Sequence, residues 1–143
     1  MTINKYYNIA KTKLFPINRS LTGRGVRKTL NILKKEFPKL KIKKFKSGKK
    51  VFDWNIPAEW NVNDAYVIDK YNNKIIDFKK NNLHLVGYSI PLKKTITKKE
   101  LFKNLYFLKD QPKAIPYITS YYKRRWGFCV SYNQYKKMKD KRY

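Results

Sequence analysis

The sequence has 143 residues, of which 42% are hydrophobic and 16% aromatic, and it contains few glycines and prolines. This composition excludes a collagen-like chain and argues against intrinsic disorder, and the length fits one domain or a small core with an inserted piece. The formal charge is +26, from 35 Lys and Arg against 9 Asp and Glu. Such a charge makes nucleic acid a candidate partner, although base readout favours arginine and almost all of these cations are lysines. A genome rich in A and T would also supply lysines without function.

The single cysteine, Cys129, cannot form an internal disulfide, and no Cys/His spacing typical of a zinc finger occurs. The N-terminus lacks the apolar run and small-residue cleavage site of a secretory signal, and no apolar stretch is long enough to span a bilayer. We therefore expect a cytoplasmic protein with no membrane partner.

The first third of the chain predicts two helices. Residues 2–13 carry a weak apolar stripe typical of a short surface helix, and Thr22 is expected to cap a second helix that runs to about Glu36. Four apolar residues of the second helix share one face: Val26, Leu30, Leu33 and Phe37. Pro38 ends this helix, and residues 40–45 then predict a strand that leads into the block VFDWNIPAEW.

The middle of the chain predicts strands. AYVID and KIIDF read as a hairpin joined by a turn at Asn72 and Asn73, residues that tolerate positive φ. LHLVGYSI predicts a further strand, on which Leu83 and Leu85 face one way and His84 faces the other.

The last third predicts short elements of both kinds. Thr97 and Glu100 have the spacing of a capping box, so a short helix is expected to begin there, with Leu101, Leu105 and Leu108 on its inner face. YITSYYKRRWGFCVSY alternates as one or two strands, and Asn133 is expected to cap a final helix.

VFDWNIPAEW, at residues 51–60, is the most specific block. It places Asp53 beside Trp54 and Glu59 beside Trp60. These carboxylates and indoles could contact a substrate. Alternatively, the two tryptophans form the core of a small domain, which needs such bulky side chains.

Catalytic motifs are absent from the sequence. HExxH, CxxC and GxxxxGK do not occur, and we assign no catalytic residue and no metal ligand. His84, the only histidine, is a candidate substrate contact or, alternatively, a structural histidine hydrogen-bonded near Asn81 or Asn82. Cys129 is expected to be a buried small hydrophobe rather than a reactive thiol.

Four arginines are candidates for binding an anion: Arg19, Arg24, Arg124 and Arg125. Arg24 stands between two glycines at a helix start, where backbone amides could hold an anion, but two glycines make a weak motif and we favour the alternative, a plain helix-entry turn. Arg124 and Arg125 lie in TSYYKRRWGF, whose rings could stack on nucleic acid or could instead pack inward while the basic tips reach solvent.

Four blocks occur in order along the chain: LFPINRSLTGRGVRKTL, VFDWNIPAEWNVNDAYV, NNLHLVGYSIP and IPYITSYYKRRWGFC. Together they resemble the aminopeptidase-like proteins with an inserted domain of unknown function, often named polysaccharide-biosynthesis proteins with an aminopeptidase-like domain. The resemblance implies an α+β chain in three parts. Residues 1–46 would be the opening helices of an incomplete α/β zinc-peptidase-like core, residues 47–116 an inserted β-rich domain, and residues 117–143 a truncated return to the core.

The resemblance also implies that the zinc ligands of the full-length family lie beyond Tyr143. We therefore expect the N-terminal fragment of a zinc-dependent aminopeptidase-like hydrolase that is inactive alone, with no cofactor of its own. Either a truncated or split gene product then requires a partner chain that carries the missing core, or the chain is a remnant. The full-length family would act on a peptide-like or small amine substrate, whose amine Asp53 or Glu59 could receive, with Trp54 or Trp60 as one wall of the site. The alternative is a basic module that binds nucleic acid or another polyanion.

Overall fold

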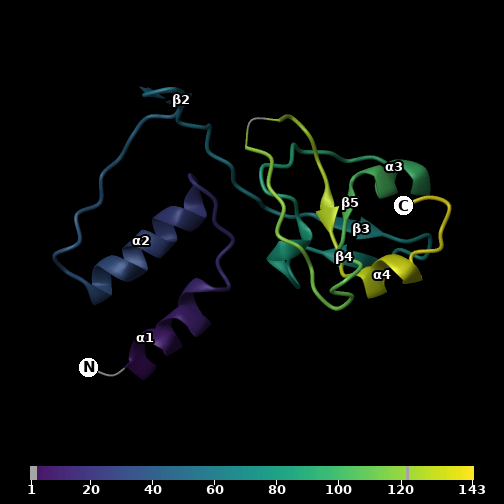
Figure 1. Ribbon diagram of the computed structural model, residues 1–143, viewed down its shortest axis with the longest axis horizontal. Coiled ribbons are helices and arrows are strands. Elements are labelled where there is room, and N and C mark those ends of the chain that lie inside the picture. The colour runs from purple at the N-terminus through teal and green to yellow at the C-terminus, as the bar shows by residue number, and fades with distance from the viewer. Residues whose placement is uncertain (1–2, 122) are drawn as a thin grey trace. The chain divides into compact units, whose positions relative to one another are not determined.

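The computed structural model describes residues 3–121 and 123–143. Thr2, in the first predicted helix, and Tyr122, in TSYYKRRWGF, lie outside the described residues. The chain divides into two compact units, Met1–Val62 and Asn63–Tyr143 (Figure 1). The boundaries predicted after residues 46 and 116 fall inside these units. The assignment of the three segments to a peptidase-like core and an insert stays a prediction.

Both predicted helices of the first unit are confirmed. Helix α1 spans Ile3–Ile9 and continues as a π-helical turn, η1, over Ala10–Leu14, and helix α2 spans Arg24–Glu36 (Figure 1). The ring of Tyr6 stacks on that of Phe37, with 5.5 Å between the centroids. This contact joins α1 to the C-terminal end of α2.

The cap predicted for α2 is wrong. Gly23, not Thr22, occupies the N-cap position, and its φ of 114° lies in the region that favours glycine. The Thr22 hydroxyl instead donates a hydrogen bond to the Ala58 carbonyl at 3.1 Å. Thr22 therefore ties the start of α2 to a segment far along the chain rather than capping the helix.

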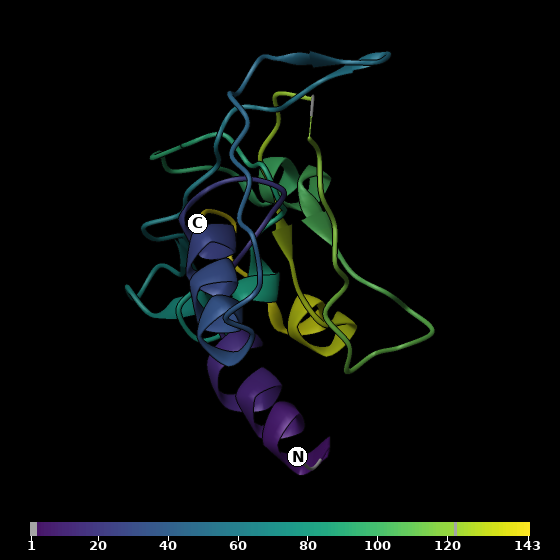
Figure 2. The same cartoon turned by 90° about the vertical axis from the view of Figure 1, so that its left-hand side faces the viewer.

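The strand predicted over residues 40–45 is also wrong, because this segment has no strand partner. A strand requires a paired neighbour, and pairing begins only at β1, Lys50–Val51, which runs antiparallel to β2, Trp54–Asn55. The turn between them places Phe52 at a φ of 53°. Figure 2 shows this hairpin at the end of the long loop that follows α2.

The predicted hairpin of the second unit is confirmed. Strand β3, Tyr66–Ile68, pairs antiparallel with β4, Lys74–Asp77, and Asn72 adopts a φ of 64° in the turn between them. The Asp69 carboxylate accepts the backbone N–H groups of Tyr71 and Asn73 at 2.9 and 2.8 Å. This side chain stabilises the turn by replacing hydrogen bonds to water.

The strand predicted from LHLVGYSI is replaced by a 3₁₀ turn, η2, over Asn82–His84, followed by isolated bridges at Leu85 and Gly87. The Asn81 side chain accepts the Leu83 N–H at 3.0 Å and so favours a turn over a strand. As a result, His84 is buried while Leu83 is exposed.

The helix predicted at Thr97 is confirmed as α3, Lys98–Lys103. The Thr97 hydroxyl accepts the Glu100 N–H at 3.2 Å, whereas the Glu100 carboxylate pairs with Lys94. Glu100 is thus drawn to a lysine instead of completing the predicted capping box with its carboxylate.

The remaining elements are β5, Leu105–Tyr106, which runs parallel to β6, Phe128–Cys129, and helix α4, Tyr132–Lys137. Ser131 caps α4 in a complete capping box with Gln134, so the predicted cap at Asn133 lies two positions too late. Among its described residues, YITSYYKRRWGFCVSY contributes the short β6, a bridge at Thr119 and, at Tyr132, the first residue of α4.

The hydrophobic core belongs to the second unit. Its buried members come from β3, β4, the loop before α3, α3, β5 and the C-terminal segment: Val67, Ile76, Ile96, Leu101, Leu105, Val130, Met138 and Tyr143. The predicted inner residue Leu108 is 36% exposed. In the part of the chain that the structure describes, no helix is long and apolar enough to cross a membrane.

Candidate functional site

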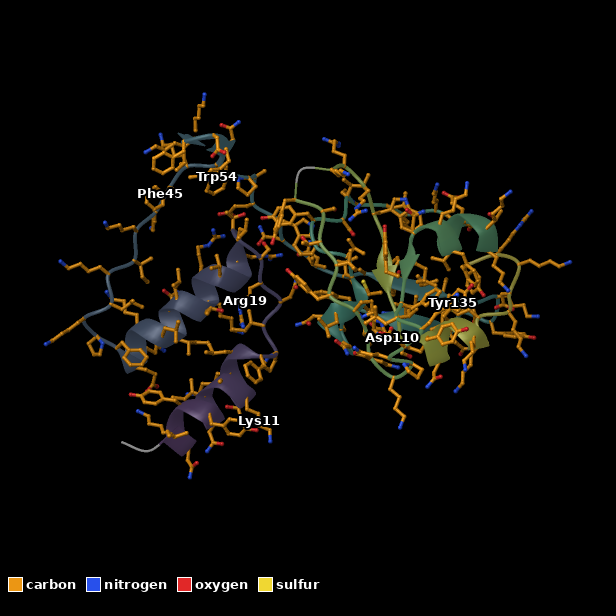
Figure 3. All side chains as sticks on the ribbon, viewed as in Figure 1. Lys11, Arg19, Phe45, Trp54, Asp110 and Tyr135 are labelled. Carbon is orange, nitrogen blue, oxygen red and sulfur yellow. The ribbon has the colours of Figure 1, made fainter. Side chains whose placement is uncertain are left out.

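The block VFDWNIPAEW separates into two places. Asp53 and Trp54 lie on the exposed β1–β2 hairpin, where Trp54 keeps 42% of its surface accessible and Phe52, at the tip, keeps 91% (Figure 3). Glu59 and Trp60 lie in the following segment, which contacts the start of α2. The hydrophobic core cluster includes neither tryptophan. The four candidate substrate contacts in this block therefore do not form one site.

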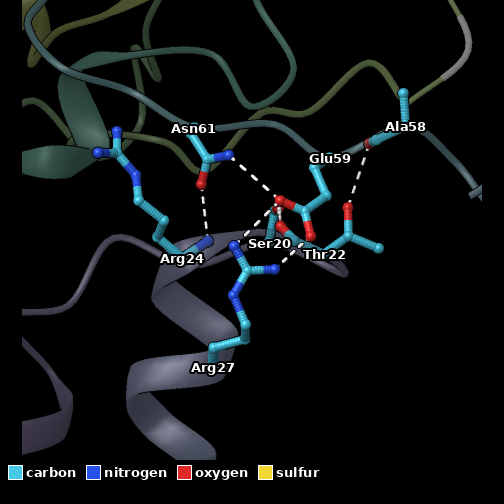
Figure 4. Close-up of polar contacts among 7 residues, drawn as sticks. All are labelled: Ser20, Thr22, Arg24, Arg27, Ala58, Glu59 and Asn61. Carbon is cyan, nitrogen blue, oxygen red and sulfur yellow. Dashed lines mark hydrogen bonds and ion pairs between the residues drawn. The ribbon is translucent and has the colours of Figure 1, made fainter. Parts of the chain in front are cut away.

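Glu59 is paired within the chain. Both terminal nitrogens of the Arg27 guanidinium bond its carboxylate, with Nη2 at 3.1 Å from Oε2, and the Asn61 amide reaches Oε2 at 3.5 Å (Figure 4). The hydrogen bond from Arg27 lowers the pKa of Glu59, and the same contact raises the pKa of Arg27. Glu59 is consequently an ionised anchor for its own segment rather than an open receptor for an amine.

The N-terminus of α2 is also occupied by this segment. The Asn61 side chain accepts the Arg24 backbone N–H at 2.6 Å, in the manner of a helix cap supplied from a distant position (Figure 4). Gly23 permits this approach, because a Cβ there would lie 2.6 Å from the Trp60 carbonyl oxygen. The Asn61 side-chain amide thus occupies the position at which the Gly23–Gly25 pattern suggested that an anion could bind.

The sequence patterns did not single out Arg27, which binds the Glu59 carboxylate, or Asn61, which accepts the Arg24 backbone N–H. They lie more than thirty positions from their partners, and no local spacing pattern connects a helix to an extended segment at that distance. The only signal was that both belong to blocks that carry the resemblance.

A surface hollow of about 560 Å³ lies beside the first turns of α2. Three cationic residues line it together with polar and apolar ones, and no acidic residue does: Thr12, Lys13, Pro16, Ile17, Asn18, Arg24, Gly25, Lys28 and Ile32. The predicted anion-binding residue Arg24 is therefore brought together with Lys13 and Lys28, which sequence analysis did not single out. An anionic group would meet a favourable electrostatic environment there.

The other three candidate arginines are not among the residues that line this hollow. Arg19 donates to the Leu14 carbonyl at 2.6 Å, and Arg124 is exposed. Arg125 is partly buried, where it donates to the Tyr106 hydroxyl at 3.3 Å and to the Thr119 carbonyl at 3.2 Å.

Two rings of TSYYKRRWGF, those of Trp126 and Tyr121, differ in how far they are buried. Trp126 is partly buried and packs against the core, as the inward alternative predicted. Tyr121 stays 39% exposed and meets Tyr88 edge to face, with 5.3 Å between the ring centroids. The inward alternative therefore describes Trp126 but not Tyr121.

His84 has a structural environment. It is buried, its Nδ1 lies 2.7 Å from the Cys129 carbonyl oxygen, and its backbone N–H donates to the Asn81 carbonyl at 3.1 Å. Cys129 is fully buried, and burial raises the pKa of its thiol to about 11. Both observations agree with the structural alternatives rather than with chemistry at these two side chains.

Residues 59–143 match the family described as "Domain of unknown function (DUF2172)". The chain is also 49% identical over 142 residues to a Clostridium acetobutylicum protein named "Putative polysaccharide biosynthesis protein with aminopeptidase-like domain". A crystal structure described as a "putative peptidase" from Clostridium acetobutylicum superposes with a TM-score of 0.88 at 48% identity.

These matches cover almost all of this chain but a minor part of the relatives. The alignment takes in 99% of this chain and 32% of the named protein, and the structural match takes in 99% of this chain and 36% of the solved one. The chain therefore spans about a third of the length of the two relatives that it matches.

Proposed function

This chain belongs to the DUF2172 family, and we propose that it is the N-terminal part of a zinc-dependent aminopeptidase-like hydrolase whose catalytic half lies outside this sequence. One observation carries the proposal: 99% of the chain aligns at 49% identity with a protein whose name includes an aminopeptidase-like domain, while most of that protein lies beyond the alignment. A partner polypeptide carrying the rest of the core, a peptide-like or small amine substrate and a cytoplasmic location belong to the same proposal.

The described residues of this chain do not fit a zinc site. Within residues 3–121 and 123–143, no group of three or more His, Cys, Asp or Glu could hold a metal ion. His84 has its Nδ1 engaged by a carbonyl oxygen, and Glu59 is bound by Arg27. Catalytic zinc needs three protein ligands, so we assign none of them, and no reaction step, to this chain.

The contribution that we assign to this chain is contact with substrate or cover over a cleft. Asp53 and Trp54 are suited to this role, because both are exposed on the same short hairpin. A carboxylate can receive an ammonium group, and an indole beside it can pack against the carbon chain that carries this group. Glu59 is less suited, since its carboxylate already serves Arg27.

Peptidase assays test the proposal. The full-length Clostridium acetobutylicum relative, this chain, and a mixture of this chain with the unmatched part of the relative would each be incubated with aminoacyl-p-nitroanilides and zinc. We expect hydrolysis by the relative and the mixture, and none by this chain. Hydrolysis by this chain alone, or inactivity of the zinc-loaded relative toward every substrate in a broad panel, would contradict the proposal.

A second function, polyanion binding, is favoured by the hollow lined by Lys13, Arg24 and Lys28. Its signature is affinity for a single-stranded oligonucleotide that falls steeply with salt. Replacing Lys13 and Lys28 by Gln should then weaken binding more than replacing Lys39 and Lys41 by Gln. The second pair of replacements removes the same charge elsewhere in the first unit. Equal losses would assign the binding to net charge alone.

A further inference from the structure

Helix α2 has an apolar face without a buried residue. The face is formed by Val26, Leu30, Leu33 and Phe37, yet none of the 13 residues of α2 is buried, and Phe37 is 46% exposed. A helix of this length is marginal in water, and helices in proteins owe most of their stability to packing of the apolar face. The face of α2 is therefore incompletely covered by this chain.

The whole first unit shows the same deficit. Among residues 3–62, only Ile9, Gly23 and Pro57 are buried, whereas every member of the hydrophobic core cluster lies in the second unit. Several large apolar side chains of the first unit are exposed: Ile3, Tyr7, Phe15, Leu21, Phe37, Phe45 and Phe52. Exposed apolar surface on this scale is typical of a contact site for another polypeptide.

We infer that the α2 face (Val26, Leu30, Leu33 and Phe37) is the docking surface for the polypeptide that makes up the rest of the longer relatives. This inference rests on the proposed function, which places this chain in a larger aminopeptidase-like assembly. The length of the relatives supports this occupant, because the chain spans only 32% of the named protein and 36% of the solved chain. If the matched part and the remaining part of the relatives share one core, the remaining polypeptide would pack against α2.

Charge argues against a second copy of this chain as the occupant. The acidic residues among positions 1–62 are Glu36, Asp53 and Glu59. Glu36 is held by Lys5 at 2.7 Å, and Glu59 is held by Arg27. Two strongly cationic surfaces repel each other, so the docked polypeptide should present apolar side chains bordered by free carboxylates.

Hydrogen exchange and calorimetry test the inference. This chain would be mixed with the unmatched part of the Clostridium acetobutylicum relative, and exchange of the α2 amides would be compared with exchange of the β4 amides. We expect fast exchange in α2 of the free chain and at least roughly tenfold slower exchange in the mixture, because docking covers a helix that was near the low end of local stability.

Two variants of α2 give a matched comparison. Leu30→Asp places a carboxylate on the apolar face, and Asn31→Asp places the same charge on an exposed neighbouring position. We expect Leu30→Asp to weaken binding at least roughly tenfold and Asn31→Asp by less than about threefold, as for central and peripheral contacts. Phe37→Ser, at a side chain that is 46% exposed and stacks on Tyr6, should weaken binding, and circular dichroism of the free chain checks that α2 survives the loss of this stack.

Several outcomes would overturn the inference. These are α2 amides as protected in the free chain as those of β4, no binding of the added polypeptide, equal losses in the two aspartate variants, or protection of α2 in a homodimer. Docking without peptide hydrolysis would retain this inference and refute the proposed function. If the mixture hydrolyses peptides at the same rate with all three variants, the proposed function is retained and this inference is overturned.

Discussion

Arg27 of α2 holds Glu59 through both terminal nitrogens of its guanidinium, although the two residues lie 32 positions apart. Glu59 belongs to the most specific block of the sequence, whose carboxylates were candidates to receive a substrate amine. The ion pair gives this carboxylate a different task, which is to keep residues 58–61 against the start of α2 (Figure 4).

The Arg27–Glu59 contact should respond to acid. The pKa of Glu59 is lowered from 4.5 by its hydrogen bond to Arg27. A lowered pKa in the folded chain means that the contact contributes its stability above the ordinary pKa and loses it as the pH falls through the lowered one. An NMR titration of the Glu59 carboxyl should therefore show a midpoint below 4.5.

Arg27→Met should return the Glu59 midpoint toward the ordinary value. Lys28→Met removes the same charge from the adjacent position of α2, where the side chain lines the hollow, and should move the midpoint less. If both variants shift the midpoint equally, general charge rather than the Arg27 hydrogen bond sets the pKa of Glu59.

Asn61→Ala should loosen the first turn of α2, because the Arg24 N–H loses its acceptor at 2.6 Å. Loss of a helix-capping side chain costs about 1 kcal/mol, which corresponds to roughly fivefold faster local exchange. Hydrogen exchange of the first α2 turn measures this change. Asn31→Ala, within α2 and away from the cap, is the control, and an equal acceleration there would show that Asn61 does not act as a cap.

Leu101→Ala should destabilise the second unit by about 2–5 kcal/mol, because Leu101 is fully buried in the core and its truncation leaves a cavity. Leu108→Ala deletes the same atoms from a side chain that is 36% exposed and should cost less than about 1 kcal/mol. Urea unfolding followed by tryptophan fluorescence compares the two variants. Similar losses would mean that Leu108 is packed as tightly as Leu101.

Cys129 should report unfolding of the second unit. Its thiol is fully buried and has a pKa raised to about 11, so little thiolate exists near neutral pH. Reaction with a thiol reagent such as 5,5′-dithiobis(2-nitrobenzoic acid) at pH 8 should be slow and should accelerate in parallel with urea unfolding. Rapid labelling of the native chain would show that Cys129 is accessible and would contradict the buried placement.

His84→Ala should destabilise the second unit by about 1–3 kcal/mol, because the buried Cys129 carbonyl loses its partner at 2.7 Å. Asn82→Ala, in the same 3₁₀ turn, should cost less. Thermal unfolding measures both. A His84→Ala variant as stable as the parent would return His84 to the candidates for a functional role.

Local sequence signals were reliable where the local chain supplies its own partners. The Asn72 turn, the Thr97 cap and the apolar period of α2 each depend on residues within a few positions. They failed where two local options compete, as at Asn81, whose side chain stabilises a 3₁₀ turn in place of the predicted strand. Residues 40–45 alternate like a strand but find no neighbour to pair with.

The sequence by itself determined the lineage of this protein, its two N-terminal helices, the Asn72 hairpin and the structural character of Cys129. Tertiary structure decided that VFDWNIPAEW is divided, with Asp53 and Trp54 exposed and Glu59 bound to Arg27. It also decided that the only core lies in the second unit of the described chain. The physical reason is that an apolar period shows which face a helix offers for packing, whereas contacts between distant segments decide whether that face is covered.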